Sequence, residues 1–266
     1  MRIAVTGGTG RVGGQVVRLL AADGRHDVVA LSSRTAPYDE PAALRAALAG
    51  VDTLVFVSSD GEAARVIVHH QNVLDAALTT GVRHVVLLSG VDADLDSPFC
   101  YAHTNGHTER LLRACGLPYS IARAGLFTEF LVGLIRQVGA RHGGTVALPA
   151  GAGRVAPVAR DDVAACLAAL ALREPTDRHH DVTGPESLAV EAVVAAAGHR
   201  HADTTPADFA AGLLRHGEQP WWTYAYTSMF ASVRQGRWAA TSDGFAELTG
   251  RAPAPLREVL AAGAMS

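Results

Sequence analysis

The fold of this 266-residue chain is decided by its first stretch, Met1-Arg2-Ile3-Ala4-Val5-Thr6-Gly7-Gly8-Thr9-Gly10-Arg11-Val12-Gly13. The pattern predicts a short buried strand over residues 3–5, a glycine-rich turn and the start of a helix. Gly7 permits the tight turn, Gly10 lets backbone N–H groups approach a phosphate, and Gly13 lets the helix pack closely on the strand. Because a helix N-terminus also attracts anions, we predict a dinucleotide site here. Its predicted cofactor-binding residues are Gly7, Thr9, Gly10, Arg11, Val12 and Gly13.

Strand and helix patterns then alternate through the first half of the chain. Apolar runs predict strands at 27–31, 53–57, 84–88 and 119–122, and helical patterns fill 41–49, 63–80 and 104–115. This alternation is typical of a parallel sheet with right-handed crossovers. We therefore expect an α/β fold, a doubly wound Rossmann-type sheet with a small, mainly helical C-terminal substrate domain. The expected domains are 1–150, with segments near 155–185 returning to it, and 186–266.

Composition excludes several function classes. The net charge of −3 gives no reason to expect nucleic acid or an anionic membrane as a partner. Cys100, Cys115 and Cys166 lack metal-ligand spacing, so we expect free thiols and no metal. No apolar run is long enough to cross a bilayer, and a cytoplasmic protein is expected. All 23 basic residues are arginine, which rules out any catalytic lysine and any Tyr-x-x-x-Lys dyad.

The order and spacing of several short motifs carry a family resemblance. They are Gly7–Gly13 with G-x-x-G-x-x-G spacing, Gln71-Asn72-Val73-Leu74-Asp75-Ala76-Ala77, His107-Thr108-Glu109-Arg110-Leu111-Leu112, Arg123-Ala124-Gly125, Arg160-Asp161-Asp162-Val163-Ala164 and Val182-Thr183-Gly184-Pro185. Together they resemble the NmrA-like branch of the atypical short-chain dehydrogenase/reductases, in particular quinone oxidoreductases of type 2. The resemblance implies a Rossmann domain, a small C-terminal domain and a substrate cleft between them.

The segment after the second strand bears on the cofactor. In relatives a further helix and an edge strand follow there, whereas here only residues 35–40 intervene, so we expect that the edge strand is lost. NAD-binding folds usually carry an acidic residue at this point for the ribose hydroxyls. This chain has Ser33 and Arg34 instead. Since a guanidinium forms a planar fork that suits phosphate, we predict NADPH rather than NADH as the cofactor.

Candidate residues for cofactor binding, and then for catalysis, follow the next two strands. Val57, Ser58 and Ser59 are expected on the nicotinamide side of the cleft, because ligands collect at the carboxyl ends of strands. Ser89 is expected either to orient a substrate carbonyl or merely to cap its strand.

A second group of candidates lies on the helix that follows. Tyr101 and Asn105 have the spacing of the Tyr-x-x-x-Lys dyad, with a neutral Asn that cannot lower the tyrosine pKa. His103 and His107 lie one helical turn apart and are candidate proton relays.

The substrate wall is predicted from aromatic residues. The candidates are Phe127, Phe130, Trp221, Trp222 and Tyr226. Their concentration in a chain with only 6% aromatic residues favours a planar apolar ligand, although such clusters also form cores. Asp162 is expected to cap the helix that it begins.

Three functions remain open at this stage. The first is an NADPH-dependent reductase of quinones or related aromatic carbonyl compounds, with a role in secondary metabolism and a homodimeric state both left open. In such a reductase positioning supplies most of the catalysis, because a conjugated carbonyl accepts hydride without a dedicated acid. The second is a regulator that binds NADP(H) without turnover. The third is a non-redox or coupling tailoring enzyme on the same fold.

Overall fold

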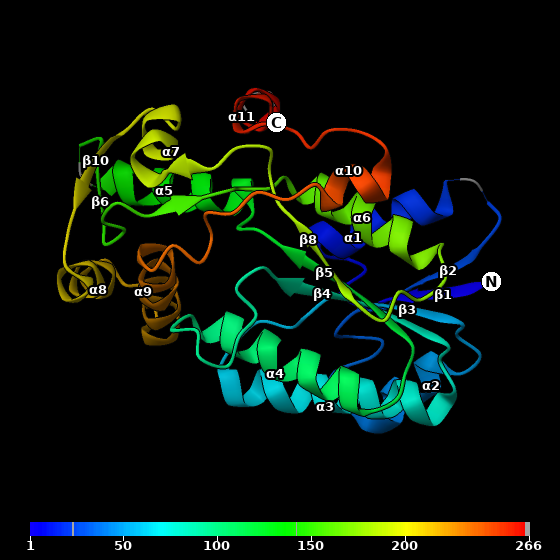
Figure 1. Ribbon diagram of the computed structural model, residues 1–266. Coiled ribbons are helices and arrows are strands. Elements are labelled where there is room, and N and C mark those ends of the chain that lie inside the picture. Colours follow the sequence, from blue (N-terminus) through cyan, green and yellow to red (C-terminus); the bar gives the residue numbers. More distant parts are fainter. Residues whose placement is uncertain (23, 142, 264–266) are drawn as a thin grey trace.

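A six-stranded parallel sheet forms the centre of the molecule. The computed structural model describes residues 1–22, 24–141 and 143–263, and Figure 1 labels their elements. The strand order is β2-β1-β3-β4-β5-β8, and every neighbouring pair is parallel. The bounds are Arg2–Val5 (β1), Asp27–Ala30 (β2), Thr53–Phe56 (β3), His84–Gly90 (β4), Tyr119–Ala124 (β5) and His179–Val182 (β8). The predicted Rossmann-type fold is confirmed.

Strand β2 is the edge of this sheet. Residues 31–40 connect it to helix α2 (Pro41–Leu48) without an intervening helix or strand. The shortened connection therefore leaves β1 and β3 paired in the middle of the sheet, as the short spacing predicted.

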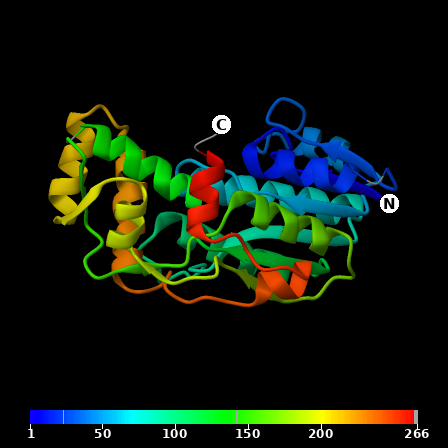
Figure 2. The same cartoon turned by 90° about the horizontal axis from the view of Figure 1, so that it is seen from above.

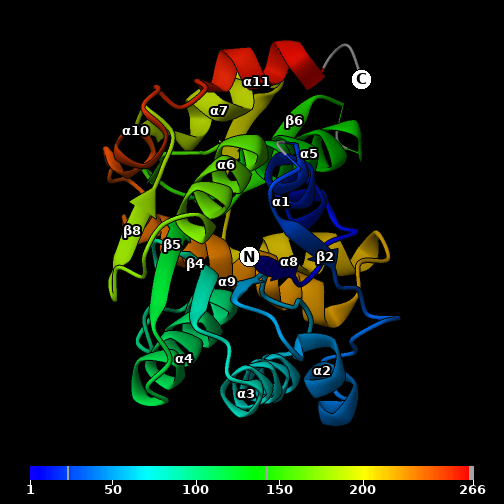
Figure 3. The same ribbon diagram turned by 90° about the vertical axis from the view of Figure 1, so that its right-hand side faces the viewer.

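Helices cover both faces of the sheet, as Figure 3 shows. Helices α1 (Arg11–Ala21), α6 (Arg160–Ala171) and α10 (Gly244–Thr249) share one apolar core with that face of the strands. Helices α2, α3 (Ala63–Thr80) and α4 (Cys100–Ala114) cover the other face. Two cores therefore hold the sheet between them, and its carboxyl edge stays open for a ligand.

A further apolar core lies beyond this edge. It combines α5 (Thr128–Arg141), α7 (Val190–Ala196), α8 (Pro206–Arg215) and α9 (Pro220–Arg234) with the strand pair β6 (Thr145–Leu148) and β10 (Arg200–Asp203). Helix α11 (Leu256–Gly263) joins it through Leu256, and the short antiparallel pair β7 (Arg154–Val155) and β9 (Leu188–Ala189) lies beside it. Figure 2 shows α5 and α7–α9 gathered at the end of the molecule away from the N-terminus.

This packing differs from the domain boundaries expected from the sequence. Apolar residues between 126 and 150 pack in the small core, whereas the sequence places them in the 1–150 domain. Conversely, Phe245 and Leu248 of α10 pack against the sheet although they belong to the 186–266 segment. The small unit also contains strands. Each core is formed by apolar side chains from segments that are far apart in the sequence, and this packing decides which segments belong together.

Three local expectations are corrected. Helix α4 begins at Cys100 rather than at 104, after an extended Phe99 that offers no side-chain cap. The ladder between β4 and β5 continues through the pairs Ser89–Arg123 and Gly90–Ala124, beyond the predicted strand ends. Asp162 does not cap α6; its buried carboxylate accepts the backbone N–H of Ala254 at 2.7 Å and pairs with Arg251 at 3.1 Å.

The described residues contain neither a membrane-spanning helix nor a cluster of metal ligands. None of the helices in 1–22, 24–141 and 143–263 combines the length and hydropathy needed to cross a membrane. The same residues contain no group of three or more His, Cys, Asp or Glu side chains placed to hold a metal ion.

Candidate active site

Helix α1 and strand β2 pack closely against the glycine turn. Gly7 has a φ of 57°, in the left-handed region that glycine tolerates. A Cβ atom on Gly13 would lie 2.3 Å from the carbonyl oxygen of Gly7, and one on Gly8 would lie 2.8 Å from Cα of Ala30. Side chains at these positions would therefore separate the turn from α1 and from β2.

The N-terminus of α1 fits an anionic group. Its N-cap is Gly10, no side chain caps the free N–H groups, and the first turn contains no acidic residue. Thr9 and Arg11 are exposed beside it. A dinucleotide pyrophosphate would find backbone donors, the positive dipole end and a guanidinium at one place. The turn predicted from the sequence is thus suited to the cofactor, although the individual residue roles stay predictions.

The end of β2 lies against this turn. The Gly8 N–H donates to the carbonyl oxygen of Leu31 at 2.8 Å. The next residues form a tight turn in which the carbonyl oxygen of Ser32 accepts the N–H of Ala36 at 2.8 Å. Ser33 and Arg34 are exposed on this turn. The adenosine ribose would lie beside residues 31–36. This segment offers the cation Arg34 and contains no carboxylate.

The end of β3 is held by a buried histidine that sequence reasoning missed. His70 Nε2 accepts the backbone N–H of Ser59 at 3.1 Å, so the neutral ring carries its proton on Nδ1, which lies 2.6 Å from Thr108 Oγ1. Burial lowers the pKa of His70 to about 3. The only signal in the sequence was a His-His pair in an otherwise apolar part of α3, and it did not indicate this contact.

A cavity of about 400 Å³ opens at the carboxyl ends of β3, β4 and β5. Predicted residues on its wall are Val12, Val57, Ser58, Ser59, Ser89, Tyr101, Asn105, Phe127, Phe130, Trp222 and Tyr226. The wall also contains Phe99 and Trp238, which were not predicted as site residues. The tertiary structure thus brings together the strand ends, one face of α4 and one face of α9.

Helix α9 contributes two stacked rings to the aromatic wall. Trp222 and Tyr226 are stacked, with ring centroids 5.9 Å apart and planes at 28°. Trp221 lies behind the wall rather than on it: its indole N–H donates to the Tyr101 hydroxyl at 3.4 Å. Parallel ring faces of this kind suit a planar apolar ligand.

Tyr101 is placed to donate a hydrogen bond into the cavity. Its oxygen accepts the backbone N–H of Gly61 at 2.9 Å and the indole N–H of Trp221 at 3.4 Å. Two donors already point at this oxygen, so its own proton is directed elsewhere. Burial raises the pKa of Tyr101, which disfavours the phenolate. The side chain is therefore suited to hydrogen bonding rather than to ionisation.

Ser89 is bonded to a buried carboxylate. Its hydroxyl donates to Glu109 Oε1 at 2.6 Å, and Glu109 also accepts two bonds from Arg123, at 2.8 and 2.6 Å. Burial opposes ionisation of Glu109, but the bonds from Arg123 and Ser89 outweigh it and leave its pKa below the ordinary value. Ser89 thus does more than cap its strand. Glu109 and Arg123 stood in the motifs of the sequence without a predicted role.

The two histidines proposed as proton relays do not line the cavity. His103 Nδ1 bonds to the backbone carbonyl oxygen of Leu95 at 2.8 Å, and Nδ1 of His107 is buried without a partner among the described residues. They share a helix face as predicted, but that face is turned away from the substrate cavity.

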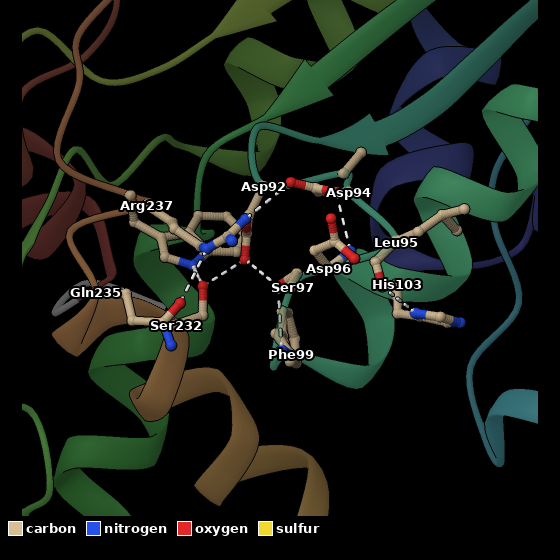
Figure 4. A network of polar contacts seen from close by, with 12 residues as sticks. Asp92, Asp94, Leu95, Asp96, Ser97, Phe99, His103, Ser232, Gln235 and Arg237 are labelled. Carbon is tan, nitrogen blue, oxygen red and sulfur yellow. Dashed lines mark hydrogen bonds and ion pairs between the residues drawn. The ribbon is translucent and has the colours of Figure 1, made fainter.

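A buried polar network joins the loop after β4 to α9 (Figure 4). The Asp92 carboxylate accepts hydrogen bonds from Ser97 at 2.6 Å and from Ser232. Arg237 bridges Asp92 and the exposed Asp94, at 3.2 and 3.1 Å. These contacts fix the loop that leads into Phe99 and Tyr101, and with it two parts of the cavity wall.

Known proteins share this sequence pattern and this fold. The NAD(P)H-binding family matches residues 7–174, more than half of the chain. The NAD(P)H azoreductase of Xenophilus azovorans is 33% identical over 211 residues, 73% of this chain and 72% of the azoreductase. An NmrA-like family domain-containing oxidoreductase of Aspergillus flavus is 28% identical over 152 residues, 48% of this chain and 49% of its own length.

A solved structure extends the similarity over the whole fold. The NADPH-dependent quinone oxidoreductase of Escherichia coli, complexed with NADPH, has a TM-score of 0.86 and 25% identity, and the match covers 98% of this chain and 99% of that chain. The resemblance noted in the sequence is thereby confirmed. With a turn suited to a pyrophosphate and a cavity at the strand ends, the chain belongs to the NAD(P)H-binding family and is similar to its NmrA-like and quinone-reducing members.

Proposed function

We propose that this protein is an NADPH-dependent reductase of quinones or related aromatic carbonyl compounds. The observation that carries the proposal is the position of the cavity. Val12 at the start of α1 and Val57 at the end of β3 line it on one side, and the rings of Trp222 and Tyr226 line it on the other. A nicotinamide at the strand ends and a planar substrate against the rings would lie face to face.

The choice of NADPH is supported by charge. Arg34 and Arg11 are both exposed beside the turn, and neither has a carboxylate partner among the ion pairs of the described residues. A 2′-phosphate would be paired there, whereas a ribose hydroxyl would gain little. The E. coli quinone oxidoreductase named above was solved with NADPH.

The chemistry asks little of the chain beyond positioning. When bound, the nicotinamide supplies a hydride. The Tyr101 hydroxyl, whose acceptor positions are occupied, donates a hydrogen bond to the substrate oxygen on which negative charge develops. That oxygen is stabilised by delocalisation in the ring and takes its proton from water. The raised pKa of Tyr101 and the absence of lysine fit a site that orients its substrate without ionising a side chain.

The direct test follows NADPH oxidation with a panel of quinones and azo dyes. We expect turnover that depends on the substrate, and we expect Trp222→Ala to raise KM about tenfold without changing the affinity for NADPH. Tyr224→Ala is the matched control, because Tyr224 lies on the same helix, is 53% exposed and does not line the cavity. No oxidation across the panel would refute the proposal.

The same experiment separates the other two functions. Calorimetric binding of NADPH without any turnover would favour a regulator that senses NADP(H). Absence of NADPH binding would favour a non-redox tailoring enzyme that keeps the fold. Equal affinity for NADPH and NADH would show that Arg34 does not bind the 2′-phosphate.

A further inference from the structure

One face of α4 presents a row of polar groups to the end of the sheet. Tyr101, Asn105 and Glu109 are spaced four residues apart, so they follow one another along the helix. Tyr101 and Asn105 line the cavity, and Glu109 contacts it through Ser89. The hydrogen-bond partners of these groups show which of them act as donors toward the cavity and which act as acceptors.

Glu109 is an acceptor. Its side chain is only 1% exposed, Arg123 binds both of its oxygens, and Arg113 adds a third charged donor at 2.7 Å. With two guanidinium groups against it, the carboxylate is ionised and carries no proton to donate.

The polarity of Ser89 follows from that of Glu109. A hydroxyl has one proton, and Ser89 donates it to Glu109 Oε1, with the two oxygens 2.6 Å apart. Toward the cavity Ser89 therefore offers lone pairs only. Tyr101 offers the opposite, because its acceptor positions are taken by Gly61 and Trp221. The cavity thus combines a fixed donor with a fixed acceptor.

We propose that Ser89 is a specificity-determining hydrogen-bond acceptor, which selects aromatic carbonyl substrates that also carry a hydroxyl group. This inference rests on the reductase function proposed above. The substrate carbonyl accepts from Tyr101, and the substrate hydroxyl donates to Ser89. A methoxy group in the same place would bring its oxygen against the Ser89 lone pairs without a proton between them, which is unfavourable. Asn105 does not discriminate in this way, since its amide both donates and accepts.

The test uses three naphthoquinones that differ at one position of the ring without carbonyl groups, which carries a hydroxyl, a methoxy group or hydrogen. Rates are measured with NADPH at a pH at which the phenol stays protonated. We expect kcat/KM to be about tenfold higher for the hydroxyl compound than for the methoxy compound, the effect of one buried hydrogen bond. In Ser89→Ala this ratio should fall to about one.

Ser58→Ala is the matched control. Ser58 lies on the same cavity wall, and its hydroxyl is likewise committed as a donor, to the backbone carbonyl oxygen of Leu88 at 2.9 Å, so it too offers only lone pairs to the cavity, but from the end of β3. The variant therefore tests whether the position of Ser89, rather than acceptor polarity alone, sets the preference. We expect this variant to keep the preference for the hydroxyl compound. Circular dichroism and calorimetry with NADPH show whether each variant folds and binds the cofactor.

Three results would overturn the inference. They are an equal rate for the hydroxyl and methoxy compounds in the wild type, an unchanged preference in Ser89→Ala, and a loss of NADPH affinity in Ser89→Ala with the preference intact, which would assign Ser89 to the cofactor. Failure of the reductase proposal is distinct, since none of the three compounds would then be reduced.

Discussion

Arg34 stands exposed immediately after β2, beside the turn that is suited to the pyrophosphate. A guanidinium in this position pairs with a phosphate on the ribose but gains nothing from a neutral hydroxyl. We therefore propose that the preference for NADPH depends on the exposed Arg34 side chain.

The consequence is measurable by calorimetry. Arg34→Ala should raise the Kd for NADPH about tenfold and leave that for NADH unchanged, and the difference should shrink as salt is added. Arg45→Ala, which removes an exposed arginine from α2, should change neither value. An equal loss of affinity for both cofactors would contradict a specific contact with the 2′-phosphate.

His70 predicts an acid sensitivity of the fold. Its pKa is about 3 in the folded protein against 6.5 as the ordinary value, so below about pH 6.5 the unfolded chain binds a proton that the folded chain refuses. Its contribution to stability is complete above that pH and is lost as the pH falls. Between about pH 7 and pH 5 the loss amounts to about 2 kcal/mol of unfolding free energy.

Urea denaturation at the two pH values tests this in His70→Gln, whose amide can still accept the Ser59 N–H but does not titrate. Its stability should drop less on acidification than that of the wild type, by about 2 kcal/mol. His179→Gln, at an exposed position, should retain the full drop. Burial also lowers the pKa of His84, to about 4, and the pKa values of His69 and His180, so these side chains contribute to the acid sensitivity that remains.

At the scale of elements, the contact between α1 and the glycine turn is set by two adjacent glycines with different surroundings. A Cβ on Gly13 would meet backbone atoms at 2.3 and 2.7 Å. One on Gly14 would have its nearest neighbour at 3.4 Å, an ordinary van der Waals distance. The motif spacing in the sequence singles out Gly13, and the packed structure agrees, since of the two only Gly13 lies too close to backbone atoms to accept a side chain.

These distances predict opposite outcomes for the same substitution. Gly13→Ala should lower the unfolding free energy by about 1–3 kcal/mol, because backbone must move, and should weaken NADPH binding through the displaced turn. Gly14→Ala should be neutral or stabilising by up to about 1 kcal/mol, since alanine favours the helix. Thermal unfolding with and without NADPH distinguishes the two. A stable Gly13→Ala that binds NADPH normally would exclude the tight packing described here.

At the scale of the whole molecule, the cavity exists only where two cores meet. The sheet supplies the strand ends, and the core of α5 and α7–α9 supplies the aromatic wall. Asp92 links the two, since it lies just after β4 and bonds Ser232 of α9 and Arg237 beyond it. Its side chain is 1% exposed, whereas that of Asp94, paired with the same arginine, is 47% exposed.

Removing either carboxylate should therefore have unequal effects. Asp92→Ala leaves Arg237 and two serines without their shared acceptor, and we expect a loss of about 3 kcal/mol in urea denaturation together with a higher KM for quinones. Asp94→Ala should change stability and KM little, because its pair is exposed to solvent. Similar losses in both variants would show that Arg237, rather than the buried Asp92, holds the wall.

Much of the Rossmann half could be predicted from local signals. The buried strand before Gly7, the apolar run of β3 and the glycine after α3 each specify an element and its place in a parallel sheet, since they encode backbone geometry and burial along consecutive residues. The short segment 31–40 likewise determined that β2 lies at an edge. Residues on the cavity wall such as Tyr101, Phe130 and Trp222 were found because a residue type or a family spacing marked them.

The remaining features depend on residues far apart in the chain. No local pattern shows that Ser89 is bonded to Glu109 or that His70 holds Ser59, because the partners lie on different elements, 20 and 11 residues apart. His103, by contrast, lies two residues after Tyr101 on α4 and so on another face of the helix, which does not line the cavity. The grouping of the cores also depends on distant residues, as apolar side chains between 126 and 150 pack with those of α7–α9. The sequence by itself determined the sheet, the turn suited to the cofactor and the absence of a catalytic lysine. Only the tertiary structure decided which donors and acceptors face the cavity, since whether a hydroxyl donates or accepts depends on partners that the fold brings together.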